Sequence, residues 1–346
     1  MRILILFLIV AGACTRTETP EPDNQTPEPT AEEAAKSGEE AAPDEQPPEP
    51  FASEEESQAG DDSAVEIDLD APPTVELLDA GKAPHKALRT TFEVGAKQSL
   101  RVESDWTVST IYGPMIAMEA VMPSLVYELD TEVQETSAER TRFALRVKKV
   151  SVEAGEKAKP AQVKAVKKSV GALEGAKGSF SVDARGLVET FALDAPVADS
   201  LIVHDMVDQI ELAVRASSLP LPEEPVGKGA TWTASQVIDQ RTAQIRQTTT
   251  FELVSMKGER LEATRKHEAA APEQNIKMPG SHSGASFQLN KFELSGEGKG
   301  TWRLDRLAPS SATDETLAAF YMTARKPKRE AVVMGVNTVL EIKAKP

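Results

Sequence analysis

The sequence predicts an α+β fold that is mainly antiparallel β, in which a long curved sheet or half-open barrel packs against two helices. Apolar residues recur with a period of two over much of residues 76–346, with polar residues between them, which is typical of strands that have one solvent-facing side. Two segments, 156–177 and 196–216, carry apolar residues at helical spacing instead. The order of strands, helix, hairpin, helix and strands therefore favours a single β-rich domain over 76–346.

The first residues of the chain have the pattern of an export signal. Met1 and Arg2 give a positive start, an apolar run of eight residues extends from Ile3 to Val10, and small residues occupy 11–13. This pattern is typical of a signal peptide that spans residues 1–13. The apolar run is too short to cross and stay in a membrane, since a spanning helix needs roughly 20 such residues.

Cys14 follows this signal and is the only cysteine of the protein, so no intramolecular disulfide can form. The segment resembles a bacterial lipoprotein signal, in which the cysteine after the cleavage site is lipidated. The resemblance implies a lipid at Cys14 that anchors the protein in a membrane of the bacterial cell envelope, most simply the outer membrane, facing the periplasm or the surface. Ala11 stands where the usual pattern has leucine, and Ala11 with Ala13 also fits an ordinary secretory cleavage site. In that alternative Cys14 carries no lipid and the protein is secreted.

Residues 14–75 are predicted to form a disordered tether behind the anchor. Thr15–Val75 contains 19 Asp and Glu against 2 Lys and Arg, with eight prolines between residues 20 and 50. Such a segment has too few large apolar residues to offset the entropy cost of ordering. A flexible chain of this length has an end-to-end distance of roughly 40 Å, which would hold the domain off a membrane.

The rest of the chain has balanced charge. Residues 76–346 contain 36 acidic and 36 basic residues, so the whole acidic excess lies in the tether. A domain that binds nucleic acid is expected to have a basic surface. We therefore expect no nucleic-acid partner.

The first strands lie between Leu88 and Val152. Leu100, Val102, Trp106 and Val108 alternate with charged and hydroxyl residues, and the same alternation returns at 125–133 and 143–147. The apolar parity then shifts to Val150 and Val152, which indicates a bulge or a strand end.

The helix predicted over 156–177 is basic. Val163, Val166, Val170 and Leu173 share one face, and six lysines surround it. A basic amphipathic helix can lie on an anionic membrane surface. A short helix packed on the sheet with its lysines in water explains the same pattern, and the lack of aromatic residues on the apolar face favours this second interpretation.

Residues 179–193 are predicted to form a hairpin with Asp183–Gly186 in its turn. The second helix is predicted over 196–216, with Asp194 before it as the N-cap residue, and carries His204 and Asp208 on its polar face. These two side chains could bind a metal or form an acid-base pair. No third ligand is nearby and ordinary ion pairs explain the pattern, so we predict no metal and no cofactor.

The remaining segments are predicted to be strands. Trp232 anchors the first of them in the core, the run from Thr242 pairs with 261–267, and 269–284 is an irregular loop. Residues 287–294 and 301–307 are expected to form a hairpin whose turn is Gly296–Gly300. The last two strands are expected at 317–324 and 332–342.

The Asp183–Gly186 turn, the helix after it and the segment Pro225–Trp232 together look similar to an uncharacterised domain family of bacterial lipoproteins and secreted proteins. The likeness covers about residues 90–345 and implies no known activity or site residue.

No motif in the sequence identifies a reaction. Residues 280–284 are Gly-Ser-His-Ser-Gly, but His282 stands where a nucleophile elbow needs serine. We therefore expect a non-enzymatic binding or scaffold domain, whose partner is a hydrophobic ligand in the concave side of the sheet or an envelope protein. The layout resembles that of carriers of lipids and lipoproteins across the bacterial periplasm. The alternatives are a hydrolase with a site around His282 or His204, and a structural lipoprotein whose tether reaches through a cell-wall layer.

Overall fold

The computed structural model describes residues 67, 73–112, 116–154, 160–195, 201–240, 243–276, 287–325 and 330–345. The signal peptide, Cys14 and His282 lie outside these residues. Strand β1 begins at Thr74, one residue before the expected end of the tether at Val75.

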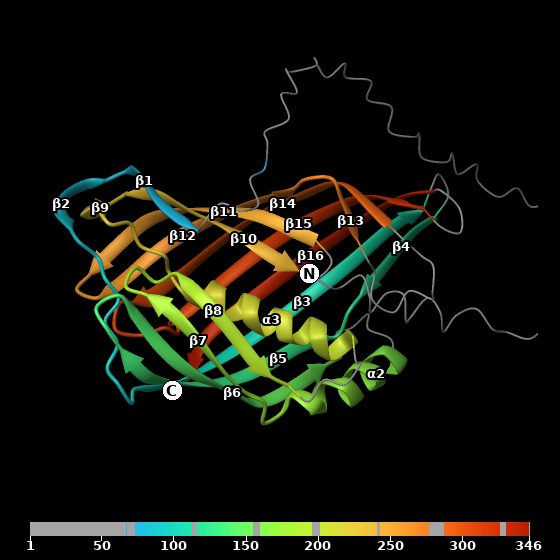
Figure 1. The fold of residues 1–346 in the computed structure, drawn as a ribbon, viewed down its shortest axis with the longest axis horizontal. Coiled ribbons are helices and arrows are strands. Elements are labelled where there is room, and N and C mark those ends of the chain that lie inside the picture. Colours follow the sequence, from blue (N-terminus) through green and yellow to red (C-terminus); the bar gives the residue numbers. More distant parts are fainter. Residues whose placement is uncertain are drawn as a thin grey trace, which may run out of the picture. The chain divides into compact units, whose positions relative to one another are not determined.

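Fourteen strands of the described residues form one antiparallel sheet (Figure 1). They are β1 (Thr74–Asp79), β3 (Lys97–Tyr112), β4 (Ile116–Val121), β5 (Ser124–Thr136), β6 (Arg140–Glu153), β7 (Lys177–Asp183), β8 (Val188–Asp194), β10 (Thr231–Gln240), β11 (Ala243–Lys257), β12 (Arg260–Ala271), β13 (Gln274–Ile276), β14 (Phe287–Arg303), β15 (Ser311–Ala324) and β16 (Glu330–Lys345). The order across the sheet is β1-β10-β11-β12-β14-β15-β16-β3-β5-β6-β7-β8, with β4 beside β3 and β13 beside β14. Strands β2 (Lys82–Lys86) and β9 (Val226–Lys228) form a separate pair.

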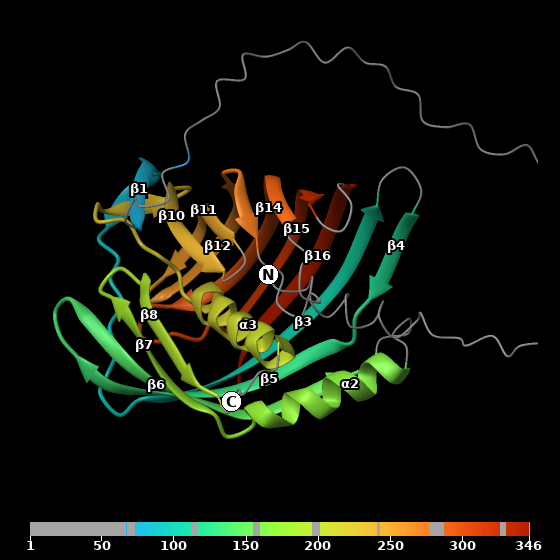
Figure 2. The same ribbon diagram turned by 45° about the vertical axis from the view of Figure 1, so that its right-hand side comes forward.

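The sheet is curved and its concave side holds a helix. Figure 2 shows the strands bending around α3 (Leu201–Ser217), and the sheet does not close into a barrel. Most inward-facing residues of the long strands are buried and apolar, as the period-two alternation requires. The prediction of an α+β, mainly antiparallel fold with a long curved sheet is confirmed.

Helix α2 (Pro160–Val170), which continues into a 3₁₀ turn at Gly171–Leu173, packs against β6. Its apolar stripe of Val163, Val166 and Val170 is buried, whereas Lys164, Lys167 and Lys168 are exposed. The apolar face is thus covered by the protein itself, as the second interpretation of this helix predicts.

Helix α3 buries one stripe against the sheet, which includes Met206, Ile210 and Ala213. It ends at Ser217, whose hydroxyl donates to the carbonyl of Ala213 one turn back. The expected start of this helix at 196 falls in residues 196–200, outside the described residues.

The two predicted hairpins have different outcomes. The hairpin at 179–193 is confirmed as β7 and β8, and the Asp183 carboxylate accepts hydrogen bonds from the backbone N–H groups of Arg185 and Leu187 in its turn. The hairpin across Gly296–Gly300 is wrong, because these residues lie in the middle of β14, a single strand of 17 residues.

The glycines of β14 provide space rather than a turn. Gly296, Gly298 and Gly300 alternate with Glu297 and Lys299, so all three face the concave side. A Cβ atom at Gly298 would overlap Oδ1 of Asp314, and one at Gly300 would press on the ring of Trp302. The missing side chains leave room for the Asp314 carboxylate on β15 and for the Trp302 ring on β14 itself.

Candidate functional site

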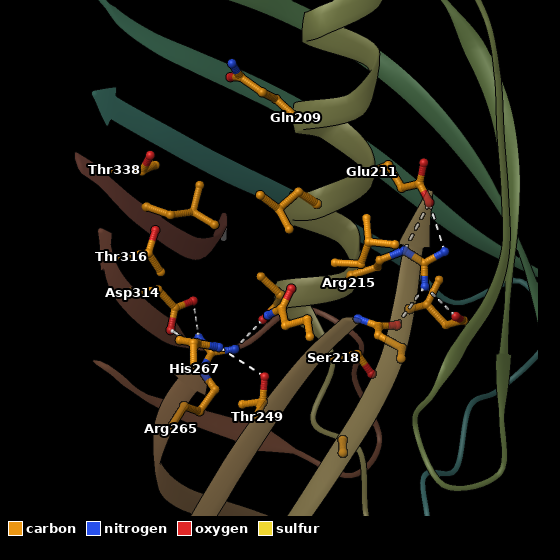
Figure 3. A pocket seen from close by; sticks show the side chains of 18 of the residues that line it. Gln209, Glu211, Arg215, Ser218, Thr249, Arg265, His267, Asp314, Thr316 and Thr338 are labelled. Atoms are coloured by element: carbon orange, nitrogen blue, oxygen red, sulfur yellow. Dashed lines mark hydrogen bonds and ion pairs between the residues drawn. The ribbon is translucent and has the colours of Figure 1, made fainter. Parts of the chain in front are cut away.

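A cavity of about 190 Å³ lies between α3 and the concave face of the sheet (Figure 3). Strands β3, β10, β11, β12, β15 and β16 supply its floor, and α3 contributes the side chains between Asp208 and Ala216. Much of the wall is apolar, and includes Val102, Leu187, Phe251, Leu294 and Leu340. The cavity follows from the fold, because a helix laid across a strongly curved sheet does not fill the space beneath it.

A buried ion pair lies in the floor of this cavity. Nη2 of Arg265 donates to Oδ2 of Asp314 at 2.7 Å, and the two side chains are only 2% and 7% exposed. Burial lowers the pKa of the Arg265 guanidinium, and Asp314 opposes this shift by attracting the charged form. The guanidinium also lies over the ring of Trp302, 4.9 Å from its centroid.

His267 extends this pair into a four-residue network. Its Nε2 lies 3.1 Å from Oδ1 of Asp314, and its Nδ1 lies 3.1 Å from Oγ1 of Thr249. Figure 3 shows Asp314, His267 and Thr249 one after another, and Arg265 lies beside them. Both ring nitrogens of His267 therefore have partners inside the protein.

The network depends on the glycines of β14, which separates β12 from β15. In the register of the sheet Gly298 lies between Arg265 and Asp314, and Gly296 lies between His267 and Thr316. A side chain at Gly298 would occupy the space that the Asp314 carboxylate uses. Two glycines at this spacing thus allow side chains of β12 to reach a carboxylate two strands away.

Polar contacts hold α3 above the cavity from several strands. Nη1 of Arg265 donates to the carbonyl of Ala216 at 2.7 Å, and Nε1 of Trp302 donates to that of Ser217 at 3.0 Å. Arg215 donates to Glu211 within the helix and to the carbonyl of Val188 in β8. These bonds fix the helix relative to both sides of the curved sheet.

Among the candidate site residues named from the sequence, Asp208 has a described side chain. His282 is outside the described residues, and His204 lies in α3 but its side chain is also outside the description. Asp208 lines the cavity. The described residues contain no group of three or more His, Cys, Asp or Glu side chains placed to hold a metal ion.

The network itself was not predicted from the sequence, although a signal for it exists. Arg265 and His267 occupy the inward parity of β12, between Ala263 and Ala269, where the alternation requires apolar residues. A charged residue at a core position needs a buried partner. The parity thus indicates that a partner exists without indicating which residue it is.

Comparison of the chain with models of known protein families gives no match, and comparison with curated proteins gives none either. No helix in the described part of the chain is long and apolar enough to cross a membrane. The function must therefore be argued from the geometry of the cavity and from the N-terminal sequence.

Proposed function

We propose that this protein is a lipid-anchored protein of the bacterial cell envelope whose β-rich domain binds a small, largely apolar ligand beneath α3. The supporting observation is the cavity of about 190 Å³ between the helix and the curved sheet. Ligand sites are typically concave and apolar, with a small number of placed polar groups. This cavity has that composition.

The size of the cavity limits the ligand. An apolar cavity of ~150 Å³ is known to hold benzene, whereas sites for drug-sized ligands have several hundred Å³. The cavity therefore suits a ligand somewhat larger than benzene. A whole phospholipid or lipoprotein acyl group would need α3 to move.

The site is held open before a ligand arrives. Hydrogen bonds from Tyr127 to Gln209 and from Arg265 to Ala216 tie α3 to two separate strands at 3.1 and 2.7 Å. A preformed site loses less free energy on binding, because the ligand does not have to order it.

A direct test is an NMR titration of the chain from residue 14 onward, with Cys14→Ser to keep it soluble, using n-hexanol as the probe. We expect shifts in the backbone amide signals of Val102 and Leu340, which line the cavity. Ala234→Leu adds bulk to the cavity wall and should abolish these shifts. Ala319→Leu, its matched control outside the cavity lining, should leave them unchanged. Absence of cavity shifts in the parent chain would contradict the proposed binding function.

The anchor is tested separately by mass spectrometry of the N-terminal peptide. With lipid at Cys14, the peptide begins at this residue and carries the mass of its acyl chains. An inhibitor of lipoprotein signal peptidase should instead leave residues 1–13 attached. A peptide that begins at an unmodified Cys14 would support the secreted alternative.

A second candidate function is a hydrolase, and one specific observation favours it. Asp314, His267 and Thr249 form a carboxylate–imidazole–hydroxyl chain with 3.1 Å at each step. The same three kinds of group activate a nucleophile in acyl transfer, although there the hydroxyl lies at Nε2 and the carboxylate at Nδ1, the reverse of His267. The chain faces the cavity. Hydrolysis of p-nitrophenyl acetate that disappears in both His267→Ala and Thr249→Val would establish this function, and no turnover above a buffer control would exclude it for that ester.

A further inference from the structure

We propose that the polar end of the ligand is an uncharged oxygen group, a hydroxyl or an ester carbonyl, which binds Trp106, Thr316 and Thr338 in the floor of the cavity. This inference rests on the proposed binding function. It adds the chemical class of the ligand and the residues that select it.

The three residues are neighbours in one row across the sheet. Trp106 of β3 pairs with Thr338 of β16, and Thr338 pairs with Thr316 of β15. Beyond Thr316 the row continues through Gly296 to His267. Directly opposed residues on adjacent strands have Cβ atoms about 5 Å apart. Thr338 can therefore share one small polar group with Trp106 on one side or with Thr316 on the other.

Trp106 presents a buried donor without an acceptor. Its side chain lines the cavity and is 6% exposed, and its Nε1 has no hydrogen-bond partner. Nearly all buried polar groups in proteins have a partner, and an indole nitrogen can only donate. This nitrogen has almost no accessible surface in the structure, so neighbouring side chains must shift for a ligand to reach it. An acceptor atom in the ligand would then supply the missing bond, which a pure hydrocarbon cannot do.

The two threonines offer complementary groups. Both line the cavity, and Figure 3 shows their hydroxyls without a hydrogen bond to the other residues drawn. A hydroxyl can donate and accept. One ligand oxygen could therefore accept from Trp106 and exchange a second hydrogen bond with Thr338 or Thr316.

The charges of the cavity wall favour an uncharged ligand. Its two arginines are paired with carboxylates, Arg265 with Asp314 and Arg215 with Glu211. Asp208 adds a further carboxylate to the wall. A carboxylate or phosphate ligand would thus find no arginine among the described lining residues that lacks a carboxylate partner. Of these arginine nitrogens only Nε of Arg265 lacks an acceptor, so little of the lost hydration would be replaced.

The experiment compares three probes of equal chain length, n-hexanol, hexanoate and n-hexane, at pH 8 with the same soluble chain. The indole N–H signals of the tryptophans are followed by NMR, and Trp106→Phe identifies the signal of Trp106. We expect n-hexanol to bind about tenfold more tightly than the other two, as one hydrogen bond provides, and to move the Trp106 signal downfield.

Variants locate the effect. Trp106→Phe and Thr338→Val should each weaken n-hexanol binding by about tenfold and leave n-hexane binding within about twofold. Thr313→Val, on the opposite side of β15 from the cavity, is the matched control and should change neither. Dispersed amide spectra establish that each variant is folded. If one of the two variants does not fold, the other still tests the proposal.

The possible failures are distinct. Equal binding of n-hexane and n-hexanol, with no effect of either variant, would overturn the assignment of the polar end but leave the binding function standing. Tightest binding of hexanoate would overturn the argument from charge. If none of the three probes shifts a cavity signal, the binding function itself fails.

Discussion

Arg265 and Asp314 form a buried ion pair across an intervening strand, with 2.7 Å between Nη2 and Oδ2. The strand between them, β14, has Gly298 at the crossing point. The same arginine also donates to the C-terminal end of α3 at Ala216. One buried side chain thus connects the sheet, the glycine positions and the helix that covers the cavity.

Removing the charge of Asp314 should destabilise the protein strongly. Asp314→Asn leaves Arg265 charged and buried, and breaking such a pair from one side costs about 3–5 kcal/mol. Urea unfolding at pH 7 measures the loss. The control is Asp305→Asn, which removes a partly exposed pair with Arg303 and should cost much less. Equal losses of unfolding free energy in Asp314→Asn and Asp305→Asn would mean that the buried pair contributes no more to stability than the partly exposed one.

Replacing both partners should restore most of the stability. The double variant with Arg265→Met and Asp314→Leu buries no charge, and such replacements are neutral or stabilising by about 1–4 kcal/mol relative to the original pair. We expect its free energy of unfolding to be no more than about 1 kcal/mol below that of the parent chain, or to exceed it. A double variant as unstable as Asp314→Asn would show that the hydrogen bond to α3, rather than charge compensation, is the main contribution.

Gly298 should not tolerate even a methyl group. The added Cβ of Gly298→Ala overlaps the Asp314 carboxylate, and overpacking of this kind costs about 1–3 kcal/mol. Gly171→Ala is the control, because nothing lies within 4 Å of its added Cβ. It should leave the free energy of unfolding unchanged or raise it by up to about 1 kcal/mol. A harmless Gly298→Ala would refute the role of β14 as a spacer.

Asp305 should contribute stability that depends on pH. The hydrogen bonds from Arg303 lower the pKa of Asp305 below its ordinary value of 3.8. The folded state therefore binds this proton less readily than the unfolded state, so the contribution is complete above about pH 5 and is lost as the pH falls through the folded pKa. The difference in unfolding free energy between the parent chain and Asp305→Asn should shrink from pH 7 to pH 3. A constant difference would contradict this assignment.

The strands could be predicted because inward and outward residues alternate along each of them. The segment Leu100–Val108 shows this, since all its apolar residues are buried in the structure. The turn at Asp183–Gly186 was equally readable, because its carboxylate caps the backbone locally. Both features can be recognised from residues that are close together in the sequence.

The glycine row and the network could not be predicted in this way. Glycines are required both in turns and beside large neighbouring groups. Only the pairing of β14 with β12 and β15 shows that Gly296, Gly298 and Gly300 belong to the second kind. Arg265 and Asp314 are 49 residues apart in the sequence. No local sequence pattern around either residue indicates that they pair. The cavity likewise results from the curvature of the whole sheet, which no single segment encodes.

The central claim is that the space beneath α3 is a ligand site, and a crystal structure of the chain grown with n-hexanol tests it most directly. We predict density for the alcohol between α3 and strands β3, β15 and β16, with its oxygen about 3 Å from Nε1 of Trp106. A cavity that is closed by α3 resting on the sheet, or alcohol bound only on the outer surface, would contradict the claim.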